Sequence, residues 1–488
     1  MCDKQGNKDA AKQKPSTPCD DPTKKCPLEE AKLITVEFLD GDNTKELAQN
    51  DKHWVNLPRD AKWVDGTHVK NIDRLSHKPR VKVKFDKPGA HSFKVKYVPD
   101  ASNIAYSAGE KGRNEKFKYE EAEKNYTTDA DGTKVIPEDF FVTACGTHKY
   151  KLKAEDTKGN KAESHTIEIH RLCHLIELKM AGIASAANTN VLEAEYDAHK
   201  IKIVKLAEKP IPKQENIGSD AESTTFQNNC RTAYTGSDAV NKEPYVIALG
   251  YTDHLAVKNA NQTVRKTGVQ AGPGKPAAVI PIRGAGLRAG DGVNDRYLWQ
   301  NIVTGESWFV SAKFEPADGS AAVNIPAAKC TAVAVDAANP SMAKSVSIDV
   351  TGLPNKVGRI SLNVNWVDRM RAGLSFGSGN LICVCTKAWW RPKSTQAQNE
   401  VMIHEFGHQI KMVVDGTGKN PDKVSTQYTA RGHVGPHCHH DLPLQASFGG
   451  VGGSKCVMFG STNGKSAFCV NCAPAVKKQD LSDGWTRF

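Results

Sequence analysis

The segment His404-Glu405-Phe406-Gly407-His408 constrains the fold of this 488-residue chain more than any other. In a helix, side chains four positions apart lie on one face, so the rings of His404 and His408 can reach a single Zn²⁺. Glu405 lies between them, where it can take a proton from a metal-bound water. A helix with this motif needs one face packed in a core and the other open to a cleft.

The residues around this segment predict a helix. Pro392 ends the preceding segment, and Thr395 with Gln398 has the spacing of a capping box. An apolar stripe follows at helical spacing, made of Met402, Phe406, Ile410 and Val413. Asp415-Gly416 then supplies a C-terminal stop. With Glu405 in register, we expect a zinc site here, rather than a core helix with two hydrogen-bonded histidines.

A catalytic zinc needs a third protein ligand. No glutamate follows Glu405, which excludes the zincins whose third ligand is a downstream glutamate. Lys411 and Val414 stand where the motif HExxHxxGxxH has glycine and histidine. The glycine-rich residues 431–441 offer His433 and His437 instead. The weaker alternatives are Asp415, Asp422 and Asp441.

The C-terminal tail resembles a known family. Its order His437-Cys438, Cys456-Val457-Met458 and Cys469-Val470-Asn471-Cys472 is similar to the HC…CxM…CxxC tail of archaemetzincin-like peptidases. The resemblance implies that His437 is the third catalytic ligand and that Met458 forms the turn beneath the zinc. It also implies a second, structural zinc held by Cys438, Cys456, Cys469 and Cys472.

The tail also departs from that family. Here 28 residues separate His408 from His437, where the family has a few, so His433 remains the second choice for the third ligand. Two disulfides remain the alternative to a zinc held by the four cysteines.

Leu381-Ile382-Cys383-Val384-Cys385 predicts a strand shortly before the helix. In zincins this position is the sheet edge, along which an extended substrate pairs backbone to backbone. Cys383 and Cys385 share one face of that strand, and we expect them in the core rather than in catalysis.

The chain as a whole reads as α+β with four regions. Residues 1–28 are rich in Lys, Asp and Pro and predict a flexible leader, and residues 29–174 predict a β-sandwich. Residues 149–170 resemble the closing strands of bacterial immunoglobulin-like domains. Residues 175–340 predict a β-rich middle domain, and residues 341–488 a zincin-like catalytic domain.

Composition limits the partners of the chain. The net charge of +11 comes largely from lysines that alternate with apolar residues, as on the solvated face of a sheet. We find no nucleic-acid motif and no run of about 18 apolar residues that would span a membrane. The N-terminus lacks the apolar core of a signal peptide, yet 13 cysteines are many for a cytosolic protein. We therefore expect secretion without a classical signal peptide.

The C-terminal half resembles the metallopeptidase extensions of VgrG spike proteins and stand-alone type VI secretion effectors. The similar segments are residues 251–255, HEFGH, GHVGPHC and CVMFG. The resemblance implies a zinc peptidase toxin that acts on a protein or peptide in the target periplasm. It further implies a secretion spike or chaperone and an immunity protein as partners. A peptidoglycan amidase or endopeptidase, and a binding protein with a structural zinc, remain the alternatives.

Overall fold

The computed structural model describes residues 30–39, 46, 48–49, 52–55, 81–103, 123–136, 147–183, 185–243, 246–283, 296–299, 306–335, 343–376, 380–388, 391–410, 433–434, 437–438, 456–459, 462, 464–470 and 472–478. Strands make up 49% and helices 17% of it, so the chain is strand-rich with several sheets and few helices, consistent with the α+β class. The predicted leader, residues 1–28, lies outside these residues.

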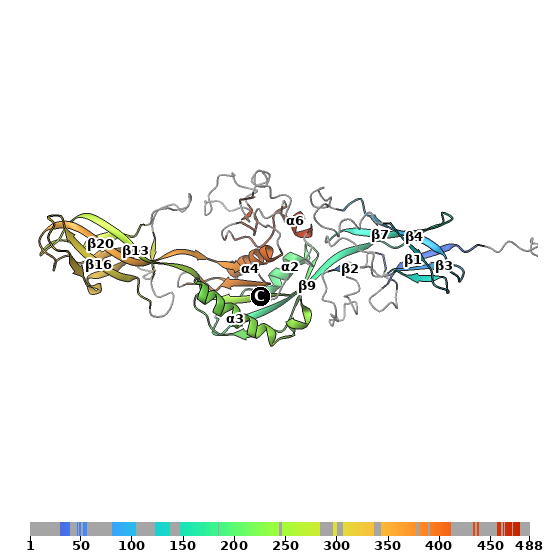
Figure 1. Ribbon diagram of the computed structural model, residues 1–488, viewed down its shortest axis with the longest axis horizontal. Coiled ribbons are helices and arrows are strands. Elements are labelled where there is room, and N and C mark those ends of the chain that lie inside the picture. Colours follow the sequence, from blue (N-terminus) through green and yellow to red (C-terminus); the bar gives the residue numbers. More distant parts are fainter. Residues whose placement is uncertain are drawn as a thin grey trace, which may run out of the picture.

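The three largest hydrophobic clusters divide the chain into three modules, which follow one another along the long axis in Figure 1. The central module carries the described α-helices. Its strands are β9 (Ile167–Met180), β10 (Ile201–Lys205), β11 (Lys209–Ile211), β12 (Val246–Thr252), β21 (Gly373–Ser375) and β22 (Leu381–Cys385). Its helices are α2 (Thr189–Asp197), α3 (Asp220–Thr235), η3 (Asp238–Lys242), α4 (Thr395–Gln409) and α6 (Ala473–Lys478). Short hairpins add β23 (Lys387–Ala388), β24 (Arg391–Pro392), β25 (His433–Val434) and β26 (His437–Cys438).

The central sheet is parallel except at its outer strand. Strands β10, β11 and β12 run parallel to β9, β22 runs parallel to β12, and β21 is antiparallel to β22. Every residue of β12 and β22 is buried, as expected for strands covered on both faces. In Figure 1, α2 and α4 lie on one side of these strands and α3 on the other. Gly250 allows the close approach of α3, because a Cβ there would meet the Phe226 ring at 2.7 Å.

The described residues of the N-terminal module form strands and no helix. They are β1 (Leu33–Phe38), β2 (Lys52–Val55), β3 (Val81–Phe85), β4 (Ser92–Pro99), β5 (Glu123–Thr127), β6 (Thr133–Val135), β7 (Lys149–Asp156) and β8 (Lys161–Glu163). The long strand β9 begins in this module and continues into the centre, so the predicted boundary at residue 174 lies inside a strand. Lysines on the outer face pair with acidic residues across strands, for example Lys94 with Glu123 at 3.4 Å. These exposed ion pairs agree with the prediction that the lysines of this region lie on the solvated face of a sheet.

The third module is inserted between β12 and β21. Its strands are β13 (Leu255–Gln270), β14 (Ala278–Pro281), β15 (Tyr297–Leu298), β16 (Phe309–Pro316), β17 (Val323–Ile325), β18 (Cys330–Ala334), β19 (Ala343–Ile348) and β20 (Val357–Arg371), with the short helix η4 (Ala327–Lys329). Strand β20 pairs with β13 over most of its length, and β19 pairs with β14 and β18. The predicted boundary between residues 340 and 341 therefore does not match the strand pairing, because these pairs join residues on both sides of it.

None of the helices in the described part of the chain is long and apolar enough to cross a membrane.

Candidate metal centre

The motif helix α4 forms as the sequence predicts, with a shift of one residue at its start. Ser394, rather than Thr395, is the N-cap, and its side chain accepts a hydrogen bond from the Ala397 N–H at 3.2 Å. Gln398 does not complete a capping box; it is buried and donates to Ser185 Oγ at 3.2 Å. The helix ends at Gln409, so Val413 and Asp415-Gly416 lie outside the described residues.

The apolar stripe fixes α4 in the central core. Met402, Phe406 and Ile410 are all buried, and the Tyr196 ring of α2 lies 4.4 Å from the Phe406 ring. The Tyr196 hydroxyl also donates to the Ile403 carbonyl at 3.0 Å. This packing leaves the face with His404 and His408 half-buried.

Three histidines converge beside α4. The ligand atoms of His404, His408 and His437 all lie within 4.8 Å of one another, and Nε2 of His404 is 2.9 Å from Nε2 of His408. His404 Nδ1 is 2.8 Å from the Val457 carbonyl and must donate to it, which leaves Nε2 as its ligand atom. Burial lowers the pKa of His404, which favours the neutral ring that a metal requires.

The structure brings the favoured third histidine, His437, to this group. It belongs to β26, which pairs with β25 so that Cys438 is opposite His433 and His437 is opposite Val434. The side chain of His433, together with Asp415, Asp422 and Asp441, lies outside the described residues.

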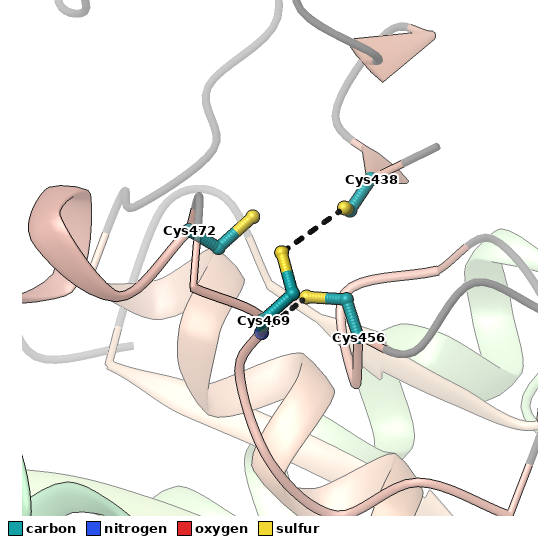
Figure 2. Close-up of side chains that lie close together, drawn as sticks. All are labelled: Cys438, Cys456, Cys469 and Cys472. Atoms are coloured by element: carbon teal, nitrogen blue, oxygen red, sulfur yellow. Dashed lines mark hydrogen bonds between the residues drawn. The ribbon is translucent and has the colours of Figure 1, made fainter. Parts of the chain in front are cut away.

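The four tail cysteines form a second group, drawn in Figure 2. The sulfur atoms of Cys438, Cys456, Cys469 and Cys472 lie within 4.8 Å of one another, and all four residues are buried. No disulfide joins these four residues, and Sγ of Cys438 is 3.8 Å from Sγ of Cys469. Four sulfurs at 2.3 Å from a tetrahedral zinc would be about 3.8 Å apart, whereas a disulfide is about 2.05 Å long. The geometry is therefore compatible with a metal and does not contain the two disulfides considered from the sequence.

One short turn, Cys456-Val457-Met458, connects the two groups. Cys456 belongs to the cysteine group, while the next residue, Val457, accepts the hydrogen bond from His404. The Met458 carbonyl accepts from the Cys438 N–H at 2.8 Å. A Cβ built on Gly407 would lie only 2.6 Å from Met458 Sδ, so Met458 packs directly against the motif helix. This contact explains why the helix carries a glycine at that position.

Polar contacts that the sequence did not reveal attach the tail to the central module. Glu195 of α2 accepts from the Phe468 N–H at 2.8 Å, and Glu400 of α4 accepts from the Gly464 N–H at 3.0 Å. The buried Arg171 donates to the Val476 carbonyl at 2.9 Å and to the His199 carbonyl at 2.6 Å. The available signal was an arginine in the middle of a strand whose burial pattern there is otherwise that of a core strand.

Glu405 is buried beside the outer strand of the sheet. Burial raises the pKa of its carboxyl group to about 8. The charge of Arg371, a hydrogen bond from the Ser375 backbone and the charge of Lys393 act in the opposite direction and lower this pKa. Strand β21 comes very close to the helix here. A Cβ on Gly373 would collide with Val401 and lie 3.0 Å from Glu405 Cγ.

Strand β22, which the sequence predicts as the sheet edge, has a neighbouring strand on each side. Strand β22, which contains Leu381, Ile382, Cys383, Val384 and Cys385, pairs with β12 on one side and β21 on the other. Among the described strands, β21 is outermost. The prediction failed because the three residues of β21 are too few to give a periodic pattern. Cys383 and Cys385 are buried, as expected.

Gln409 holds the hairpin formed by β21 and β22 against α4. It is buried, and its Nε2 donates to the Phe376 carbonyl at 3.0 Å and to the Leu381 carbonyl at 3.1 Å. Gln409 follows Glu405 by one helical turn. The bonds of Gln409 and the bond between Glu405 and Ser375 therefore attach the β21–β22 hairpin to two successive turns of α4.

Comparisons with known proteins do not assign the chain to a family. No protein-family profile and no curated protein matches it. Among solved structures, a Photobacterium 2,6-sialyltransferase is 6% identical with a TM-score of 0.14, over 42% of this chain and 35% of that one. A sialyltransferase from Photobacterium damsela is 7% identical with a TM-score of 0.12, over 34% and 41%. A two-domain Bacteroides fragilis protein of unknown function is 8% identical with a TM-score of 0.14, over 69% and 90%. Such scores do not indicate a shared fold.

We predict that Gln409→Met lowers the free energy of unfolding by about 2 kcal/mol, because the Phe376 carbonyl loses the Gln409 donor and the Leu381 carbonyl keeps only the Phe376 N–H, while the side-chain volume is kept. Urea unfolding of the purified protein measures this change. Gln227→Met on α3 is the control, since its side chain bonds only within its own helix, to Ser223. Equal stability of the Gln409 variant and the control would contradict this role of Gln409.

We predict that protonated Glu405 stabilises the folded, metal-free protein and that this contribution to the free energy of unfolding falls as pH rises. The folded-state pKa of about 8 exceeds the ordinary value of 4.5, so the folded form binds more protons between these values and is favoured at the lower pH. Urea unfolding of chelator-treated protein at pH 5.5 and pH 8 should show this loss in the wild type. The loss should be smaller in Glu405→Gln, and an identical pH dependence of the two proteins would refute the prediction.

Proposed function

We propose that the chain is a zinc-dependent peptidase of the zincin type. The observation that carries this proposal is the convergence of His404, His408 and His437 on one point, with Glu405 on the same helix beside the outer strand of the sheet. Three imidazoles leave one position of a tetrahedral zinc open, as in catalytic sites. The hydrogen bond from His404 to Val457 is the kind of contact that orients a ligating ring.

The four cysteines would hold a second zinc with a structural role. A complete set of four sulfurs leaves no open position, as in structural zinc sites. All four are buried, so water has little access to the site. We therefore propose one catalytic and one structural Zn²⁺ per chain.

Zinc held by His404, His408 and His437 would polarise the scissile carbonyl group and lower the pKa of a water towards about 7. Glu405 removes a proton from that water and later delivers it to the leaving amine. Its burial favours the protonated form, while the nearby charges of Arg371 and Lys393 favour the carboxylate that a general base requires. An extended substrate would pair with β21, whose Ser375 N–H already reaches Glu405.

We further propose that the peptidase is an antibacterial toxin delivered by a type VI secretion system to the target periplasm. The support is the likeness of the HEFGH, GHVGPHC and CVMFG segments to such effectors. The strand-only N-terminal module would be an immunoglobulin-like docking domain for a secretion spike or chaperone. An immunity protein in the producing cell would cover the zinc cleft.

We predict that Glu405→Gln lowers the rate of peptide hydrolysis at least about 100-fold and leaves the zinc content unchanged, because only the base is lost. Casein zymography and digestion of purified peptidoglycan measure the activity. Glu193→Gln on α2 is the control. Cleavage of peptidoglycan but not casein would favour the amidase or endopeptidase alternative. A fully active Glu405→Gln variant would exclude the mechanism, and inactivity of the wild type on both substrates would favour a binding protein.

We predict two zinc ions per chain by elemental analysis. His437→Ala should lose one ion, and His433→Ala should keep both. Cys469→Ser should lose the structural ion and weaken retention of the other, because the turn that supports His404 is displaced with it. Loss of zinc in His433→Ala but not in His437→Ala would reverse the assignment of the third ligand.

A further inference from the structure

The outer strand of the catalytic sheet continues directly into the inserted module. Only Ala372 separates the end of β20 at Arg371 from the start of β21 at Gly373. The chain that passes Glu405 is therefore the same chain that forms the stalk of the inserted module, visible in Figure 1 as the ribbon from β20 and β13 toward α4.

The backbone of β21 presents hydrogen-bonding groups on its outer side. The Ala372 carbonyl accepts from the Cys385 N–H at 3.0 Å, and the Phe376 N–H donates to the Leu381 carbonyl at 3.0 Å, so both groups face β22. Because backbone groups alternate along a strand, those of Gly373 and Ser375 face away from β22. The Ser375 N–H donates to Glu405, so a partner strand would pair with Gly373 and the Ser375 carbonyl or would compete with Glu405 for that N–H.

The end of β20 also has an exposed side. On one side Arg369, Met370 and Arg371 pair with β13. On the other side, the pairing with β15 and β16 reaches only Val367. Within the described residues no strand pairs beyond that point. The side chains of Asp368 and Arg369 are 39% and 52% exposed, so solvent reaches this stretch.

We propose that residues 368–375 form one docking edge for an extended polypeptide, which pairs with β21 at the catalytic helix and continues along the stalk of the inserted module. The proposal rests on the proposed function for the chemistry at Glu405, and it adds the substrate class. Eight residues of strand span roughly 26 Å, about twice the length of a four-residue peptide. The occupant is thus an unfolded or flexible segment of a protein, and not a short peptidoglycan stem peptide. The stalk contributes recognition that the catalytic residues alone do not provide.

The test uses the full-length, zinc-loaded protein and peptides from β-casein. Mass spectrometry of the digest locates a cleavage site, and fluorescein-labelled peptides of four, six, eight and ten residues are then built around it. If the digest shows no cleavage, peptides of the same lengths are taken from one fixed segment of β-casein. We expect kcat/KM to rise about tenfold or more from four to eight residues, mainly through KM, as added backbone pairs form. N-methylation of alternate peptide bonds in the added residues should remove the gain.

A charge-reversal variant of Arg369 tests whether the peptide contacts the stalk. The kcat/KM values of peptides with Glu and with Lys in the added residues are compared for the wild type and for Arg369→Glu. The variant should reverse the preference of the wild type between these two peptides. Arg265→Glu is the matched control, because Arg265 is an exposed arginine of β13 in the same ribbon but outside the edge. The control should keep the preference of the wild type.

Fluorescence polarisation with Glu405→Gln separates this proposal from the proposed function. Binding that strengthens with peptide length, together with no cleavage by the wild type, would overturn the peptidase and support the docking edge. Cleavage with the same kcat/KM for four and ten residues would overturn the docking edge and leave the peptidase intact. The absence of both binding and cleavage would overturn the docking edge as well.

Discussion

The hydrogen bond from His404 Nδ1 to the Val457 carbonyl is the contact on which the candidate site depends. Val457 lies between Cys456, which belongs to the cysteine group, and Met458, which packs against Gly407 and binds the Cys438 backbone. The histidine and cysteine groups therefore share one three-residue turn. The adjacent residues His437 and Cys438 of β26 join the two groups a second time, so the two cannot be treated as independent sites.

Buried polar groups hold this arrangement in place. Tyr196, Glu195 and Arg171 connect α2 and β9 to the motif helix and the tail, and Gln409 connects the helix to the outer hairpin. A buried polar atom that loses its partner is costly, so each of these bonds specifies one position of the tail and of β21. Apolar packing alone would allow the same surfaces to meet in several positions.

The inserted module changes how the outer strand is positioned. Strand β21 has only three residues, but it continues from the long β13–β20 ribbon and is attached to α4 by the contacts of Gly373, Ser375 and Gln409. The contacts that hold it beside Glu405 belong to the central module, while the strand that it continues belongs to a module with a hydrophobic cluster of its own.

The sequence by itself determined the motif helix, the histidine pair that is a candidate for metal binding and the strand-rich class, because each depends on local spacing and periodicity. Only the tertiary structure decided which strand lies outermost, since β22 pairs on one side with β12, which is far away in the sequence, and on the other side with the three-residue strand β21. The same holds for the module boundary, which β19 and β20 cross by pairing with earlier strands. His437 and the four cysteines could be named from their order, but their convergence required the Val457 turn and buried partners such as Arg171, which carry no local pattern.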